Sequence, residues 1–189
     1  MCGISGILYS HSHEEISSIS KLMNQELAHR GPDASGQWIE SNNTVALAHR
    51  RLSILGLGVD GNQPMSSRCG RFMIVFNGEI YNFQQIKKKL QLPDLKSGSD
   101  TEVLIEAISK IGIAQTLDIV NGMFAFAVWD KKNLCMTLAR DRMGEKPMYY
   151  SIQNNALIFA SELKALTKAS GFEFKICANA LNLYFQHGY

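Results

Sequence analysis

Phe72-Met73-Ile74-Val75-Phe76 is the stretch on which the prediction of the fold rests. It is a wholly apolar run of strand length, and such a run indicates a strand whose two faces are both covered. Phe124-Ala125-Phe126-Ala127-Val128-Trp129 has the same character and predicts a second buried strand. Further strands are predicted at residues 4–9, 45–48, 134–139, 148–151 and 157–160.

Hairpins connect several of these predicted strands. Residues 130–133 supply one turn, and Gln153-Asn154-Asn155 supplies another. Helices are predicted at residues 15–27, 82–90, 99–111, 161–168 and 178–186, with Asn82, Ser99 and Ser161 as N-terminal caps, while residues 29–36 and 55–64 predict loops. The sequence therefore predicts an α+β fold of largely antiparallel sheets, with two packed sheets between layers of helices.

The composition is that of an ordinary globular domain, with 46% apolar and 19% charged residues in a chain of 189. A formal net charge of +2, without a basic stripe, argues against nucleic acid as a partner. No stretch approaches the ~20 apolar residues of a membrane span, and the N-terminus lacks the basic flank and apolar run of a signal peptide. None of the four cysteines lies in a Cys-x-x-Cys pair, so no metal site is predicted, and a cytoplasmic chain with reduced thiols is expected.

Cys2 follows the initiator methionine directly, and a small residue at this position permits removal of Met1. Removal would leave Cys2 with a thiol and a free α-amine, whose ordinary pKa values of about 8.5 and about 7.7–8.0 lie near neutral pH. The amine could then accept the thiol proton, so that one residue supplies both nucleophile and general base. By position alone, a chance cysteine at an ordinary start is the simpler interpretation.

Four further features carry chemistry. Asn77-Gly78 predicts a tight turn after the apolar run, but a side-chain amide and an unhindered N–H can also form an oxyanion hole. Arg51 suits either a surface salt bridge or a bidentate pair with a substrate carboxylate. Asp100 suits either capping of a helix or binding of a substrate ammonium, and Glu79 is a second carboxylate for that role. Together with Cys2, these residues suit an α-amino acid with a side-chain amide, which is glutamine or asparagine.

Eight ordered motifs resemble those of one known family. They begin with Met1-Cys2-Gly3-Ile4-Ser5-Gly6 and His29-Arg30-Gly31-Pro32-Asp33, and continue at residues 47–54, 77–82, 99–102, 122–126, 140–147 and 160–166. Over almost its whole length the chain resembles the N-terminal glutaminase domain of glutamine-hydrolysing asparagine synthetases. Residues 30–33 and 77–82 favour this type over the glutaminases that serve sugar-phosphate or purine pathways.

The resemblance implies an N-terminal-nucleophile hydrolase fold over residues 2–189, a four-layer αββα sandwich with two antiparallel sheets. It makes Cys2 the nucleophile and assigns the oxyanion to Asn77 and the N–H of Gly78. Arg51 would bind the α-carboxylate of the substrate L-glutamine, and Glu79 and Asp100 would bind its α-ammonium. The pocket lining that the resemblance implies is Leu52, Ser53, Ile54 and Leu55. Arg30 and Asp33 are expected to brace the site rather than to contact substrate.

The family continues with a synthetase domain that binds ATP through a Ser-Gly-Gly-x-Asp-Ser loop, and this sequence holds no such motif. Residues 170–189 are expected to be a helical lead-in to that domain, which makes the chain a fragment or one subunit of a split enzyme. The glutaminase half needs no metal or organic cofactor, whereas the complete enzyme would need ATP and Mg²⁺ to amidate aspartate. If Met1 stays in place, the amine of Cys2 is locked in a peptide bond and the base is lost.

Two alternatives stay open. One is a related glutaminase whose ammonia goes to a sugar, peptide or lactam acceptor, since the acceptor site would lie on the missing domain. The other is a scaffolding domain without catalysis, against which the retained Cys2, Arg51, Asn77, Gly78 and Asp100 argue. A homodimer is also left open.

Overall fold

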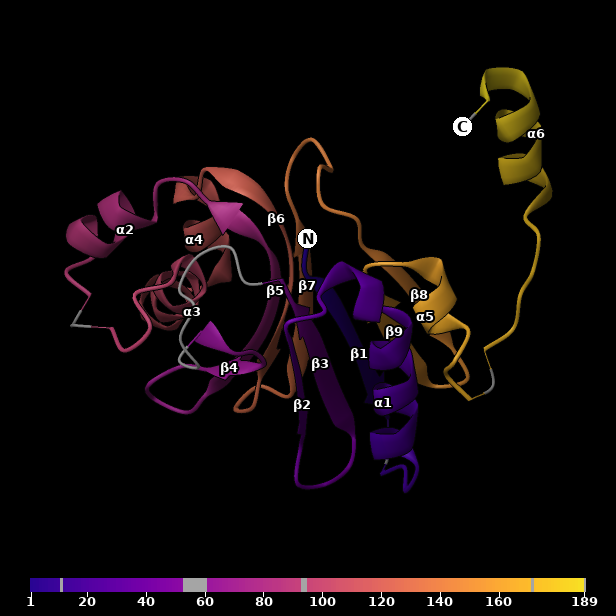
Figure 1. Ribbon diagram of the computed structural model, residues 1–189, viewed down its shortest axis with the longest axis horizontal. Coiled ribbons are helices and arrows are strands. Elements are labelled where there is room, and N and C mark those ends of the chain that lie inside the picture. The colour runs from indigo at the N-terminus through magenta and orange to yellow at the C-terminus, as the bar shows by residue number, and fades with distance from the viewer. Residues whose placement is uncertain (11, 53–60, 93–94, 171, 189) are drawn as a thin grey trace.

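The computed structural model describes residues 1–10, 12–52, 61–92, 95–170 and 172–188. Two antiparallel sheets form its centre (Figure 1). The larger sheet has the strand order β2 (Ala34–Ile39), β3 (Val45–Arg51), β1 (Gly3–Tyr9), β9 (Ala156–Ala160) and β8 (Tyr149–Gln153). The smaller sheet has the order β4 (Met65–Ser66), β5 (Phe72–Ile80), β6 (Gly122–Asp130) and β7 (Cys135–Arg140).

Helices cover the outer face of each sheet (Figure 1). The larger sheet is covered by α1 (Ile16–Glu26) and α5 (Leu163–Leu166), and the short 3₁₀ helix η1 (Ala28–Arg30) follows α1. The smaller sheet is covered by α3 (Asp100–Ile111), which packs against α2 (Phe83–Lys89) and α4 (Ile113–Ile119). The expected four-layer αββα sandwich with two antiparallel sheets is therefore confirmed.

The apolar run at the start of β5 shows why two sheets stack. Met73 and Val75 face the larger sheet and join the core between the sheets, which Ile4 and Phe159 reach from the other side. The alternate residues Ile74 and Phe76 join a second core beneath α3. Because side chains alternate between the faces of a strand, a run that is apolar at every position needs a covering layer on both sides. A third core lies between α1, α5 and the larger sheet.

The predicted turn at Asn77-Gly78 is wrong. Both residues lie inside β5, and the ladder with β6 continues through Gly78↔Phe124 to the end of the strand. A Cβ on Gly78 would lie 2.3 Å from the carbonyl oxygen of Met123, so glycine is needed here for close approach of the two strands and not for a turn. The local turn preference is overridden because the partner strand extends the full length of β5.

Of the three predicted helix caps, Ser161 is wrong, and Asn82 holds the N-cap position of α2 without a side-chain capping bond. Ser99 does cap α3, because its side chain accepts a hydrogen bond from the backbone N–H of Glu102. The side chain of Asn82 instead joins the carbonyl of Ile119 and the N–H of Asn121, which ties α2 to the end of α4. Ser161 accepts a hydrogen bond from the N–H of Ile4, and the helix after it ends at Leu166 rather than near residue 168.

Four short elements were not predicted: β2, β4, α4 and η1. The first half of β2 was predicted to be part of a polar loop, and the residues of β2 are intermediate or exposed because it is the edge strand of the larger sheet. An edge strand lacks the strong apolar signal of a buried one. Of the predicted loop at 55–64, residues 55–60 lie outside the described residues, and 61–64 form no strand or α-helix.

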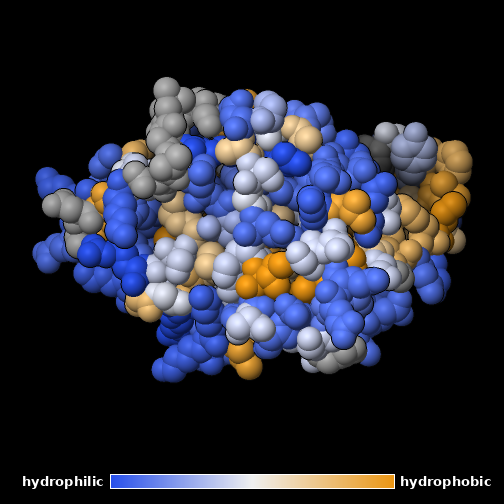
Figure 2. Space-filling view, turned by 60° about the horizontal axis from the view of Figure 1, so that its bottom comes forward, coloured by the Kyte–Doolittle hydropathy of each residue, from blue (hydrophilic) through white to orange (hydrophobic). Residues whose placement is uncertain are grey.

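The last helix, α6 (Ala178–His187), was predicted at 178–186. It follows an extended stretch and stands apart from the sandwich (Figure 1). None of its residues is buried, although Leu183, Tyr184 and Phe185 are large and apolar. Hydrophobic side chains gather at the end of the molecule where α6 lies (Figure 2).

The core between the sheets is expected to contribute a large part of the stability. Phe159 is fully buried there, so Phe159→Ala should lower the free energy of unfolding by about 3–5 kcal/mol. Phe185 on α6 is 76% exposed and provides a matched control, since Phe185→Ala should change this free energy by less than about 0.5 kcal/mol. Denaturant titration of both variants checks the expectation, which equal losses would contradict.

Candidate active site

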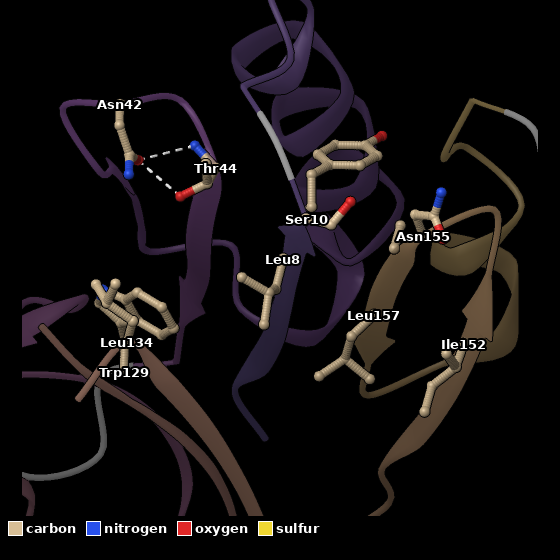
Figure 3. A pocket seen from close by; sticks show the side chains of 11 residues that line it. Leu8, Ser10, Asn42, Thr44, Trp129, Leu134, Ile152, Asn155 and Leu157 are labelled. Atoms are coloured by element: carbon tan, nitrogen blue, oxygen red, sulfur yellow. Dashed lines mark hydrogen bonds between the residues drawn. The ribbon is translucent and has the colours of Figure 1, made fainter.

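Two cavities lie at opposite ends of the sandwich. The larger, of about 560 Å³, is lined by apolar residues of both sheets, such as Leu8 and Leu157 on one side and Trp129 and Leu134 on the other (Figure 3). No carboxylate, thiol, imidazole or cation is among its lining residues. The smaller cavity, of about 360 Å³, lies where β1 and β6 begin and β3 and β5 end. Reactive groups line only the second of these two cavities, so it is the candidate active site.

The smaller cavity brings the predicted site residues together. It is lined by Cys2, Arg51, Leu52, Asn77, Gly78, Glu79 and Asp100, among other residues. They come from the beginning of β1, the end of β3, the end of β5 and the first residue of α3. The predicted lining residues Ser53, Ile54 and Leu55 lie outside the described residues.

Cys2 sits at the head of β1, the middle strand of the larger sheet. Its thiol points toward the carbonyl oxygen of Leu52, 3.8 Å from Sγ. Nε of Arg30 donates a hydrogen bond of 3.0 Å to the Cys2 carbonyl. Neither Arg30 nor Asp33 lines the cavity, and the N–H of Asp33 donates to the carbonyl of Arg51. Both residues therefore hold the backbone of residues that do line it.

Asn77 presents a buried amide without a protein partner. The residue is 2% exposed, and its Nδ2 atom makes no hydrogen bond. A buried donor without an acceptor is costly, and such groups are rare in folded proteins. Asn77 lines the cavity, so the arrangement suits the binding of a substrate oxygen beside it.

The backbone of Phe76, the residue before Asn77, is held at both its N–H and its carbonyl. Oε1 of Gln63 accepts a hydrogen bond from the N–H of Phe76 at 2.6 Å, and Nε2 of His49 donates to its carbonyl at 3.2 Å. Because a carbonyl only accepts, His49 carries its proton on Nε2. Burial lowers the pKa of His49 to about 4, aided by the nearby charge of Arg51 and opposed by the bond to Phe76, so the imidazole is neutral at pH 7.

Charged side chains complete the cavity wall. Arg51 is 8% exposed, and its Nη1 donates to Oδ1 of Asn62 at 3.0 Å. The carboxylate of Asp100 accepts from the N–H of Ile80 at 2.9 Å and from its own neighbour Thr101 at 2.8 Å. Burial, with the nearby charge of Glu79, raises the pKa of Asp100 despite these hydrogen bonds. A bound cation would offset the repulsion between the two carboxylates.

His49, Gln63 and Lys146 are among the lining residues that were not predicted as site residues. Lys146 is 7% exposed, and its Nζ lies 3.6 Å from Sδ of Met1. His49 lies in the motif at residues 47–54 and Lys146 in the motif at residues 140–147, but nothing in the local sequence indicated that either side chain lines the site. Gln63 had no signal, since its role depends on the fold that brings it to Phe76.

Within the described ranges, no group of three His, Cys, Asp or Glu side chains is arranged to hold a metal ion. No helix in the same ranges is both long enough and apolar enough to cross a membrane.

A two-sheet αββα sandwich with a cysteine at the head of its middle strand is the architecture of the N-terminal-nucleophile hydrolases. The glutamine phosphoribosylpyrophosphate amidotransferase of Bacillus subtilis shares this fold, with a TM-score of 0.75 and 24% identity over 88% of this chain and 43% of that one. A family model described as a glutamine amidotransferase domain matches residues 1–189. The chain belongs to this family.

Curated relatives refine the resemblance. The chain is 37% identical over its whole length to the putative asparagine synthetase [glutamine-hydrolyzing] 2 of Methanocaldococcus jannaschii. It is 41% identical over 88% of its length to asparagine synthetase [glutamine-hydrolyzing] 2 of Bacillus subtilis. Amidase chry2 of Gibberella zeae is 36% identical over 96% of the chain. The chain spans 40%, 22% and 28% of the length of these relatives, respectively.

The buried imidazole of His49 predicts a loss of stability in acid. Its pKa of about 4 in the folded chain lies below the ordinary value of 6.5, so the unfolded chain binds a proton that the folded chain excludes. The stability that depends on a neutral His49 is fully present above about pH 6.5 and is lost as the pH falls toward 4. The free energy of unfolding should fall by about 3 kcal/mol over this interval for this reason. His49→Gln keeps an N–H donor but does not titrate, so its free energy of unfolding should fall less over this interval. Identical pH dependence in the two proteins would show that His49 does not titrate as described.

Proposed function

We propose that this chain hydrolyses the side-chain amide of L-glutamine with Cys2 as the nucleophile, and so releases glutamate and ammonia. The observation that carries the proposal is the meeting of one thiol, one unpartnered buried amide, one guanidinium and two carboxylates in a single cavity. Each group has a counterpart in glutamine. The thiol attacks the amide carbon, and the buried amide donates to the oxyanion that develops there. The guanidinium pairs with the α-carboxylate, and the two carboxylates pair with the α-ammonium. No comparable set lines the other cavity described above.

Removal of Met1 is the first requirement, because it converts the peptide nitrogen of Cys2 into an amine. The amine takes the thiol proton, and the thiolate attacks the amide carbon of glutamine. Nδ2 of Asn77 and the N–H of Gly78 donate to the oxyanion as the carbon becomes tetrahedral. The amine returns the proton to the leaving nitrogen, and ammonia departs. Water then attacks the γ-glutamyl thioester, which yields glutamate and restores the thiol.

The charged residues set the choice of substrate. Arg51 pairs with the α-carboxylate, while Glu79 and Asp100 hold the α-ammonium, so both charges of an amino acid are matched inside a largely buried site. Leu52 supplies a further part of the wall. This half-reaction needs no metal or organic cofactor, since Cys2 supplies the nucleophile and the base.

The ammonia acceptor is proposed from the relatives. Those whose names specify glutamine-hydrolysing asparagine synthesis suggest that this domain serves the amidation of aspartate, with ATP and Mg²⁺ bound by a synthetase domain. Residues 170–189, with the exposed α6, then form the lead-in to that domain. A cytoplasmic location follows from that metabolic role. A sugar, peptide or lactam acceptor is the alternative, and the downstream sequence distinguishes the two.

Covalent labelling tests the proposal. A chloroketone analogue of glutamine should add once to chain that lacks Met1, as intact mass and peptide mapping to Cys2 would show, and Cys2→Ala should remove this adduct. Cys69 needs its own control, because hydrogen bonds from Ser109 and Ser67 lower the pKa of its thiol and it is exposed. The Cys69→Ser variant should label as the wild type does. Labelling of Cys69 alone on chain free of Met1 would refute the proposed nucleophile.

Asn77 is expected to act on the transition state and not on the fold. Asn77→Ala should lower kcat for glutamine hydrolysis by about 10²–10³, because one oxyanion donor is lost. The free energy of unfolding should change little, since Nδ2 has no protein partner to lose. Asn82→Ala is the converse control: it breaks two hydrogen bonds between α2 and α4 but should leave kcat within about twofold. A normal kcat in Asn77→Ala would remove Asn77 from the oxyanion site.

A further inference from the structure

The ladder between β1 and β9 ends before it reaches the nucleophile. The last pair in register is Ser5↔Ala160, after which the chain leaves the sheet and turns into α5. Ser161 extends the contact by one residue, because its N–H donates to the carbonyl of Ile4 at 2.9 Å and its Oγ accepts from the N–H of Ile4 at 3.0 Å. Beyond Ser161, no strand in the part of the chain that the structure describes holds residues 2 and 3 on this edge.

The geometry of a strand shows which group of Cys2 needs a partner. In an antiparallel sheet, the N–H and C=O of one residue point to the same neighbouring strand, and every second residue points to the same side. Ile4 directs both groups toward Ser161, so the carbonyl of Cys2 points to that edge as well. Arg30 takes the place of the missing strand there, with Nε 3.0 Å from the Cys2 oxygen.

Glu162 fixes this guanidinium. Its Oε1 accepts from Nη1 of Arg30 at 3.0 Å, and the Arg30 side chain is 9% exposed. His29 reaches the same oxygen at 2.9 Å, and Lys164 lies 3.5 Å from Oε2. Although burial by itself would raise it, hydrogen bonds from Arg30 and His29 hold the pKa of Glu162 below its ordinary value. Glu162 precedes α5 but makes no capping bond, so its carboxylate is committed to these three side chains.

We infer that Glu162 is a positioning residue for the nucleophile: it aims Arg30, which holds the Cys2 carbonyl and thereby orients the thiol and the amine. This inference rests on the proposed role of Cys2. Once Met1 is removed, the Cys2–Gly3 peptide is the first of the chain, and its carbonyl is the last backbone group that the sheet edge can hold. The amine and the side chain of Cys2 both rotate about the bond to this carbonyl carbon, so its orientation sets their starting geometry.

A double-mutant cycle on chain free of Met1 tests whether Glu162 acts through Arg30. Glu162→Ala should lower kcat for glutamine hydrolysis by about tenfold or more, with KM within about twofold, because misplacement of the nucleophile affects the chemical step. In an Arg30→Ala background the same substitution should cost less than about twofold, since its route of action is already gone. Lys164→Ala removes another partner of Glu162 and should leave kcat unchanged. Glu162→Gln, which retains an oxygen acceptor, should fall between wild type and Glu162→Ala.

Thermal unfolding and a second readout complete the test. If Glu162→Ala proves poorly folded, the comparison of kcat between Glu162→Gln and Lys164→Ala takes its place: a lower kcat in Glu162→Gln alone supports the positioning role, and equal values contradict it. Should the wild type hydrolyse no glutamine, the proposed function fails, but the cycle can still be measured as the rate of alkylation of Cys2 by iodoacetamide. The positioning role would be supported if Glu162→Ala slows alkylation of Cys2 in the wild-type background but does not slow it further in the Arg30→Ala background. Additive effects of the two substitutions, or a wild-type rate in Glu162→Ala by either readout, would overturn it.

Discussion

The antiparallel pairing of β1 with β3 is the constraint on which the rest of the structure depends. The register Gly3↔Arg50 places the head of β1 beside the end of β3, so that Cys2 and Arg51 line the same cavity although they are far apart in the sequence. β1 is also the middle strand of its sheet and is buried on both faces. A Cβ on Gly6 would lie 2.4 Å from the ring of Phe159, which lies directly opposite on the neighbouring strand β9, so the ring of Phe159 needs a glycine at this position.

This packing gives the two ends of the sandwich different properties. At one end, hairpin turns and apolar side chains leave an open cavity with no titratable side chain other than a tyrosine on its wall. At the other end, strands of both sheets begin or end beside the start of α3, and polar side chains gather there. The unpartnered amide nitrogen of Asn77 is held in place because Gln63 and His49 fix the backbone of the preceding residue, Phe76. The stability of the surrounding core thus offsets the cost of burying a donor that awaits an acceptor.

Several local signals predicted the wrong partner for a polar side chain. Asn82 and Ser161 both precede helices, yet their side chains bind backbone groups 37–39 residues away for Asn82 and 157 residues away for Ser161. Asn77-Gly78 has the composition of a turn but lies within a nine-residue strand. Asn82 and Ser161 each satisfy a backbone group of a distant segment, and Asn77-Gly78 follows the length of its partner strand. Neither requirement is visible in the local sequence.

The sequence by itself determined the layers and the chemistry of the site. Two strands that are apolar at every position require a covering layer on both faces. Cys2 at position two and the family motifs around Arg51, Asn77 and Asp100 identify residues that line the same cavity. Only the tertiary structure decided how these residues are held: the neutral state of His49, the role of Gln63, the burial of Lys146 and the link from Glu162 through Arg30 to Cys2. The physical reason is that alternation and motif spacing depend on neighbours along the chain, whereas hydrogen bonds, burial and pKa shifts depend on groups that the fold brings together from distant positions.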